Sequence, residues 1–162
     1  MKNLKLKPIE PHIVSREPFT VVGLEYKGPM KNMVDIPKLW HLFNDRIQEI
    51  ENKMAEDRLY GVFYQTPSQR ATSEMTYMAC VPVSHDQEIP EGMISKEVQG
   101  GKFAALTHKG PISDIVQSID FLHSWILGSE FEFDQRESYE LYDNRFQYES
   151  ADSEFDIFLA IK

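Results

Sequence analysis

This chain of 162 residues has one cysteine and no long apolar run. Cys80 has no second thiol to pair with, so an intrachain disulfide is excluded, and its place in the apolar run YMACVPV predicts a buried, unreactive side chain. No apolar stretch approaches the roughly 20 residues that a bilayer-spanning helix needs. The starting segment, MKNLKLKPIEPHIV, lacks the continuous apolar core of a signal peptide. We therefore expect a cytoplasmic protein that does not bind a membrane.

Motifs of the common enzyme classes are also missing. The sequence has no glycine-rich phosphate loop and no nucleophile elbow of the G-x-S-x-G type. Its five histidines include no pair at the spacing of zinc ligands, and His108 matches Tyr26 in the repeat described below, which favours a structural role. We expect no metal and no cofactor.

Basic side chains are outnumbered by acidic ones. Seventeen Lys and Arg stand against 26 Asp and Glu, which gives a formal charge of −9. Such a charge repels the phosphates of nucleic acids and attracts cations. We expect no direct binding of nucleic acid, and the two repeats leave no room for a DNA-binding module. Moderate acidity is also common among soluble proteins, so it supports a cationic ligand without requiring one.

The two halves of the chain resemble each other. LEYKGPMKNMV at 24–34 resembles LTHKGPISDIV at 106–116, and SEMTYMACV at 73–81 lies over SEFDIFLAI at 153–161. Several matches in the same order and at nearly constant spacing indicate a duplication. We expect one domain over 1–162, with a first repeat at about 10–84 and a second at about 93–162.

Each half has the same order of predicted elements. A strand is followed by a Gly-Pro pair, an amphipathic helix and two more strands. The helix of the first half is predicted from Ile36 to Met54, and that of the second from Ile112 to Ile126, ended by Gly128. The predicted strands are 19–27, 59–66, 75–83, 102–109, 139–146 and 155–161. The expected fold is α+β, a duplicated β-α-β-β unit with pseudo-twofold symmetry and an antiparallel-type sheet with two helices on one face.

The strand predicted within SYELYDNRF contains a carboxylate, Glu140, which would be costly to bury. Alternate side chains of a strand share a face, so Glu140 and Tyr142 point one way while Tyr139 and Leu141 point the other. The repeat alignment places Gly61 over Glu140. If the two strands meet across the pseudo-twofold axis, the glycine leaves room beside the carboxylate, provided the register is not shifted. The ordinary alternative is a glutamate on a solvated face.

In their order along the chain, these motifs resemble the GyrI-like small-molecule-binding family. The matching pieces are THKGP at 107–111, a helix with Trp125 near its end, ELYDNRF at 140–146 and the closing EFDIFLAIK. The family includes effector-binding domains of AraC-type and MerR-type transcription regulators, and this chain looks like a stand-alone form. The resemblance covers nearly the whole chain and implies the duplicated β-α-β-β fold.

The resemblance also implies a ligand site around Glu140. In multidrug-binding relatives, a strand glutamate at this position faces lipophilic cations in an aromatic pocket. Aromatic faces attract a cation by roughly 0.5 to 2 kcal/mol, and a partly desolvated carboxylate adds a charge interaction. Core packing is the ordinary alternative role of these aromatic residues. The residues expected to line the pocket with Glu140 are Tyr142, Trp125, Trp40, Phe63 and Tyr77.

The resemblance, together with these residues, implies three functions. The first is binding of lipophilic, cationic small molecules, for sensing or sequestration. The second, which the resemblance also implies, is hydrolysis of strained cyclopropanoid toxins, with Glu140 as general base and Tyr142 as acid or orienting donor. The third is an acidic protein partner of the gyrase-inhibitor type, acting on gyrase or on a separate regulator. Its acidic run is Glu130, Glu132, Asp134 and Glu137, for which a solvated loop is the ordinary alternative.

Overall fold

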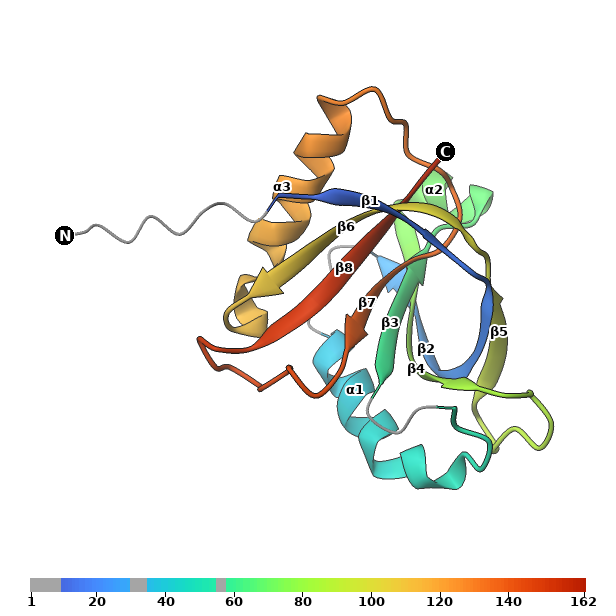
Figure 1. The fold of residues 1–162 in the computed structure, drawn as a ribbon. Helices are drawn as coiled ribbons and strands as arrows, with labels where there is room; N and C mark the ends of the chain where they lie inside the picture. Colours follow the sequence, from blue (N-terminus) through green and yellow to red (C-terminus); the bar gives the residue numbers. More distant parts are fainter. Residues whose placement is uncertain (1–9, 30–34, 55–57) are drawn as a thin grey trace.

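Alternating apolar residues pair into one eight-stranded antiparallel sheet in the computed structural model, which describes residues 10–29, 35–54 and 58–162 (Figure 1). The strands are β1 (His12–Arg16), β2 (Phe19–Pro29), β3 (Leu59–Tyr64), β4 (Glu74–Val83), β5 (Ile94–Val98), β6 (Gly101–Lys109), β7 (Ser138–Tyr142) and β8 (Glu154–Ile161). The helices are α1 (Asp35–Arg46), α2 (Pro67–Thr72) and α3 (Ile115–Leu127), with 3-10 turns at Ile47–Glu49 and Ile112–Asp114. The predicted α+β class is confirmed.

The strand order is β1-β6-β8-β7-β3-β4-β2-β5. If β1 to β4 are exchanged with β5 to β8, the same order results, read from the opposite edge of the sheet. Its centre lies between β3 and β7, where Gly61 is the direct partner of Glu140. Each half contributes one edge strand to the strands of the other half: β1 pairs with β6, and β5 pairs with β2. This arrangement is what a duplicated unit with a twofold axis at the β3–β7 pair would produce. The sequence had not predicted β1, β5 or α2.

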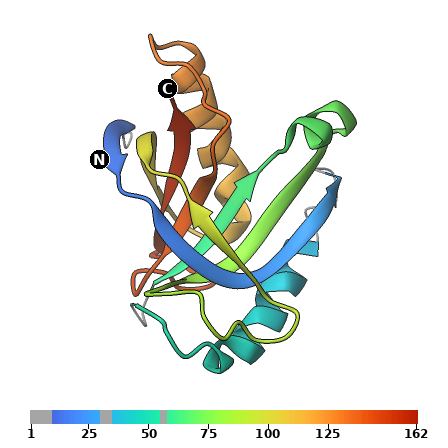
Figure 2. The same ribbon diagram turned by 90° about the vertical axis from the view of Figure 1, so that its right-hand side faces the viewer.

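The sheet has two buried faces with different partners. Figure 2 shows the sheet curled into a trough, with the long helices α1 and α3 on its outer side. Inside the trough, side chains from all eight strands pack against one another, among them Tyr139 and Leu141. On the outer face, α1 packs over β2 and β4, and α3 packs over β6 and β8. Trp40 and Phe63 belong to both helix-side clusters, so they lie where the two halves meet.

Three predicted elements end earlier in the structure, one of them the strand expected at 59–66, which ends at Tyr64 because Thr66 caps α2. The first helix was expected to reach Met54, but α1 ends at Arg46 and Ile50 is already extended. Residues 52–54 pair with the end of β4, where the Met54 N–H donates to the Pro82 carbonyl at 2.9 Å. Ile50 still lies in the core, whereas the Met54 side chain is 66% exposed. Backbone pairing with β4 therefore outweighs the helical periodicity at this end.

The strand predicted to reach Phe146 ends at Tyr142. Asp143 starts a turn in which its side chain accepts a hydrogen bond from the Arg145 N–H at 3.0 Å and its carbonyl accepts one from Phe146. Aspartate favours such turns because its short side chain satisfies nearby backbone donors. The part of the first repeat motif at 30–34 lies outside the described residues. Among the helices of the described residues, none has the length and apolar character to span a bilayer.

Candidate ligand-binding site

Glu140 lies on the helix side of β7 and is only 6% exposed. Two phenols hold its carboxylate: the Tyr142 hydroxyl donates to Oε1 at 2.7 Å, and the Tyr77 hydroxyl donates to the same oxygen at 2.9 Å. Within the described residues, Oε2 receives no hydrogen bond, and no basic side chain forms an ion pair with this carboxylate. Hydroxyl groups therefore donate hydrogen bonds to only one of the two oxygens of this buried carboxylate.

Trp40 extends this hydrogen-bonded chain to α1. Its indole Nε1–H donates to the Tyr77 hydroxyl at 2.9 Å, so the donors point in sequence from Trp40 through Tyr77 to Glu140. The indole also stands edge-on to the Tyr142 ring, with centroids 5.6 Å apart. Trp40 is half-buried. It is the part of the cluster that comes from a helix rather than from the sheet.

Burial controls the protonation of this cluster. Removal from water raises the pKa of Glu140 to about 7, although the hydrogen bonds from Tyr142 and Tyr77 act in the opposite direction. Burial and the nearby carboxylate raise the pKa of both phenols well above their usual range. The tyrosines therefore remain donors at neutral pH, while the carboxyl group changes between its acid and its anion there.

Gly61 is required where β3 passes the carboxylate. A Cβ atom at this position would collide with the Tyr77 hydroxyl and would stand 2.6 Å from Glu140 Oε1. The register prediction is confirmed, since Gly61 and Glu140 are direct partners. The space that the missing side chain leaves is filled by the Tyr77 hydroxyl.

The remaining predicted pocket residues lie at different distances from the carboxylate. Phe63 is one same-face step from Gly61 along β3 and packs in both helix-side clusters. Trp125 packs on the α3 side and stacks on Phe131, with centroids 6.4 Å apart. The structure thus joins Trp40, Tyr77 and Tyr142 to Glu140 by a connected set of contacts and places Trp125 in a neighbouring cluster. The ligand-binding roles of all six residues stay predictions.

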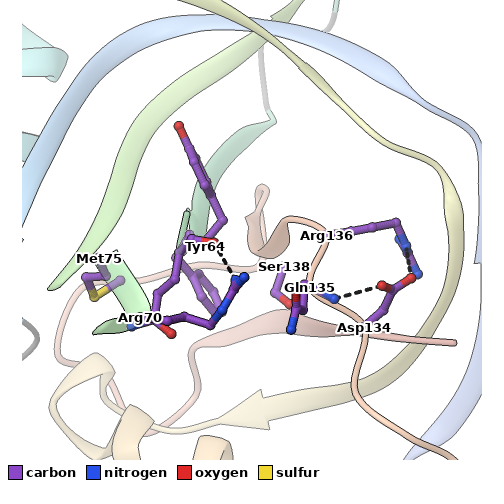
Figure 3. A pocket seen from close by; sticks show the side chains of 9 residues that line it. Tyr64, Arg70, Met75, Asp134, Gln135, Arg136 and Ser138 are labelled. Atoms are coloured by element: carbon purple, nitrogen blue, oxygen red, sulfur yellow. Dashed lines mark hydrogen bonds and ion pairs between the residues drawn. The ribbon is translucent and has the colours of Figure 1, made fainter. Parts of the chain in front are cut away.

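Neither of two hollows found in the described residues is lined by Glu140. The first, of about 210 Å³, lies beside Phe63 at the ends of β3, β4 and β7 (Figure 3). The second is an open hollow on the outside of α1, lined by Pro37, Lys38, His41 and Leu42. Sequence reasoning missed the first hollow and the short helix α2 beside it. The signal was readable, because Thr66 and Gln69 form a capping box with Pro67 between them.

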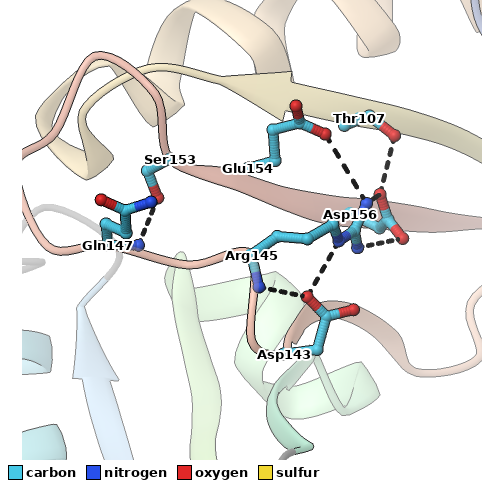
Figure 4. A network of polar contacts seen from close by, with 7 residues as sticks. All are labelled: Thr107, Asp143, Arg145, Gln147, Ser153, Glu154 and Asp156. Atoms are coloured by element: carbon cyan, nitrogen blue, oxygen red, sulfur yellow. Dashed lines mark hydrogen bonds and ion pairs between the residues drawn. The ribbon is translucent and has the colours of Figure 1, made fainter.

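The turn after β7 is held by Arg145 (Figure 4). Its Nε donates to Asp143 Oδ1 at 2.9 Å and its Nη2 donates to Asp156 Oδ2 on β8 at 2.8 Å. Thr107 on β6 donates to the other oxygen of Asp156 at 2.7 Å. These contacts give the DNR part of the motif a structural role: they tie the end of the Glu140 strand to its neighbours.

Two residues considered in the sequence are structural here. Cys80 is fully buried as predicted, and burial raises the pKa of its thiol. Both ring nitrogens of His108 are engaged, with the Ser118 hydroxyl at 2.6 Å and the Pro111 carbonyl at 3.0 Å. Among the residues that the structure describes, no group of three or more His, Cys, Asp or Glu side chains is placed to hold a metal ion.

Known proteins resemble this chain in sequence and in fold. The transcriptional regulator BrlR of Pseudomonas aeruginosa is 31% identical over 159 residues, which cover 97% of this chain and 57% of that protein. The chain therefore spans little more than half the length of this relative. Among solved structures, SAV2435 bound to tetraphenylphosphonium has the same fold, with a TM-score of 0.78 at 15% identity, covering 95% of this chain and 94% of that one.

A hydrolase encoded by lin2189 from Listeria innocua also shares the fold, with a TM-score of 0.55 at 12% identity, covering 94% of this chain and 92% of that one. The family profile of the GyrI-like small molecule binding domain matches residues 9–162. This match spans the sheet, both long helices and the Glu140 cluster. The chain belongs to the GyrI-like small molecule binding domain family.

Proposed function

We propose that this protein binds lipophilic cations at Glu140, for sensing or sequestration. The observation that carries the proposal is a carboxylate that is buried among aromatic rings and has no basic partner within the described residues. Burying such a group is costly unless a positive charge or a proton compensates it. A cationic ligand would supply that charge, and the faces of the surrounding rings would add cation–π attraction.

Binding requires a rearrangement above the carboxylate. The Trp40 indole and the Tyr142 ring occupy the space next to Glu140 on the helix side. A ligand that reaches Oε2 displaces the Trp40 indole and breaks its hydrogen bond to Tyr77, while the phenols stay on Oε1. Trp40 is half-buried and comes from a helix, whereas Tyr77 and Tyr142 are buried in the sheet. SAV2435, which shares the fold, was solved with tetraphenylphosphonium bound, so this cation is a suitable probe.

Isothermal titration calorimetry with tetraphenylphosphonium at pH 8 tests the proposal. We expect saturable binding that Glu140→Gln weakens about tenfold, which corresponds to about 1.4 kcal/mol for the loss of one charge-assisted contact. Glu97→Gln removes an exposed carboxylate of β5 and is the matched control, with unchanged affinity expected. Equal affinities of the wild type and Glu140→Gln would remove Glu140 as the anchor, and no binding by any of the proteins would refute the cation site.

Hydrolysis is the second candidate, and the raised pKa of Glu140 favours it. A carboxyl group that titrates near neutrality, next to two phenolic donors, has the properties of a general base with an adjacent acid. Its test is product formation from a strained cyclopropane electrophile, followed by chromatography, with the wild type and with Glu140→Gln. Turnover that is lost in the variant would support the enzyme, whereas saturable binding without product supports the first proposal.

The acidic-partner hypothesis stays a prediction. Two of its four acids are already paired, because Glu137 is buried beside Lys96 at 3.3 Å and Asp134 lies 2.8 Å from Arg136. The absence of direct nucleic acid binding and the cytoplasmic location also stay predictions, to be checked by gel-shift and fractionation experiments.

A further inference from the structure

The hollow beside Phe63 lies at the end of the sheet and is lined from both faces, by Phe63 and Ser138 from the face of the carboxylate and by Tyr64 from the trough. In the β3–β7 pair, Phe63 is the partner of Ser138 and Gly61 is the partner of Glu140. Ser138 lines the hollow and is two residues from Glu140, which in a strand corresponds to about 7 Å on the same face. Phe63 also lines the hollow and packs in the clusters that contain Tyr77 and Tyr142. Its ring is thus in contact with both the hollow and the Glu140 cluster.

The lining of the hollow carries an excess positive charge, unlike the chain as a whole, whose formal charge is −9. Its charged residues are Arg70, Arg136 and Asp134. Arg136 and Asp134 neutralise each other through an ion pair of 2.8 Å, and Arg136 also donates to the carbonyls of Lys102 and Ile161. Arg70 therefore accounts for the excess.

Arg70 is held by a backbone carbonyl just before its helix rather than by an acid. Its Nη1 donates to the Gln65 carbonyl at 3.1 Å, and within the described residues it forms no ion pair with a carboxylate. Figure 3 shows its side chain pointing into the hollow, on the side opposite the Asp134–Arg136 pair. The guanidinium retains free donors in a fork that matches the two oxygens of a carboxylate.

We propose that this hollow is the outer compartment of the Glu140 site and that the ligand is zwitterionic, with an aromatic cationic end at Glu140 and an acidic group at Arg70. The inference rests on the proposed function and adds the second charge of the ligand. A negative charge at Glu140 and a positive charge in the adjoining hollow select a molecule that carries both. Phe63, which is only partly buried, turns aside to connect the two compartments.

A matched pair of dyes tests this ligand class. Tetramethylrhodamine carries a free carboxylate, whereas its methyl ester is a cation of nearly the same shape. Fluorescence anisotropy at pH 8 gives the ratio of the two affinities for the wild type, Arg70→Gln, Arg58→Gln and Glu140→Gln. Arg58 is an exposed arginine outside the lining of the hollow, so Arg58→Gln controls for the change in net charge.

We expect Arg70→Gln to lower the affinity of the carboxylate dye relative to the ester by about twofold to fivefold, since Arg70 is exposed to solvent. Arg58→Gln should leave this ratio unchanged, and salt should reduce the effect of Arg70. If Glu140→Gln weakens the ester but Arg70→Gln leaves the ratio unchanged, the cation site stands and the outer compartment is refuted. If the wild type binds neither dye, the proposed function fails, and the zwitterion inference fails with it.

Discussion

Replacing Glu140 by glutamine should change the pH dependence of folding stability more than any other exchange in the core. The variant keeps the shape of the side chain and an oxygen that accepts hydrogen bonds from Tyr142 and Tyr77, but it cannot ionise. In the wild type, burial raises the pKa of Glu140 from 4.5 to about 7. The unfolded chain loses this proton near the ordinary pKa, whereas the folded protein keeps it until about pH 7.

The sign and the magnitude follow from proton linkage. Below pH 4.5 both states are protonated, and Glu140 makes no pH-dependent contribution. As the pH rises from 4.5 to 7, the folded state binds more protons than the unfolded state, so the free energy of unfolding decreases. The full shift amounts to about 3 kcal/mol, at about 1.4 kcal/mol per pKa unit. Above pH 7 the loss remains constant, because both states are then ionised.

Urea unfolding followed by circular dichroism at pH 4.5, 6 and 8 measures this effect. We expect the stability of Glu140→Gln relative to the wild type to increase by about 3 kcal/mol between the lowest and the highest pH. Glu97→Gln should show a constant difference from the wild type, since it changes an exposed carboxylate. The reasoning would be refuted if the difference in free energy of unfolding between Glu140→Gln and the wild type did not change with pH. It would also be refuted if the wild type became more stable relative to the variant as the pH rises.

Three further predictions concern the same cluster. Gly61→Ala should destabilise the fold by about 2 to 3 kcal/mol in urea unfolding, because the added Cβ collides with the Tyr77 hydroxyl and the carboxylate, and full stability would refute the described packing. Trp40→Phe should cost about 1 kcal/mol through loss of the indole donor to Tyr77, while Trp125→Phe leaves that bond intact and serves as the control in the same assay. Tetraphenylphosphonium has a fixed charge, so its calorimetric affinity should fall below pH 7 as Glu140 takes up a proton and should level off about tenfold below the affinity at pH 8, and affinity that is independent of pH would contradict an ionised anchor.

Much of the fold was predictable because local patterns and long-range pairing agree. The apolar alternation in the strands and the 3.6-residue period of α3 survive in the structure, and Gly128 ends that helix as expected. The prediction failed where long-range contacts compete with local periodicity. Residues after Arg46 join the edge of β4 instead of continuing α1, and β1 and β5 are strands only because each completes the other half of the sheet.

The sequence by itself determined the alternation that puts Glu140 and Tyr142 on one face and the repeat that aligns Gly61 with Glu140, because both depend on positions along the chain. The expected aromatic residues included Tyr77 and Trp40, but only the tertiary structure decided that these two join Glu140 by hydrogen bonds while Trp125 packs in a neighbouring cluster. It also decided that Arg70 borders a hollow close to the cluster. Those contacts join strands and helices far apart in the chain. They depend on the curvature of the sheet and on the position of α1 on its outer face. Both are set by packing across the whole molecule rather than by any local pattern.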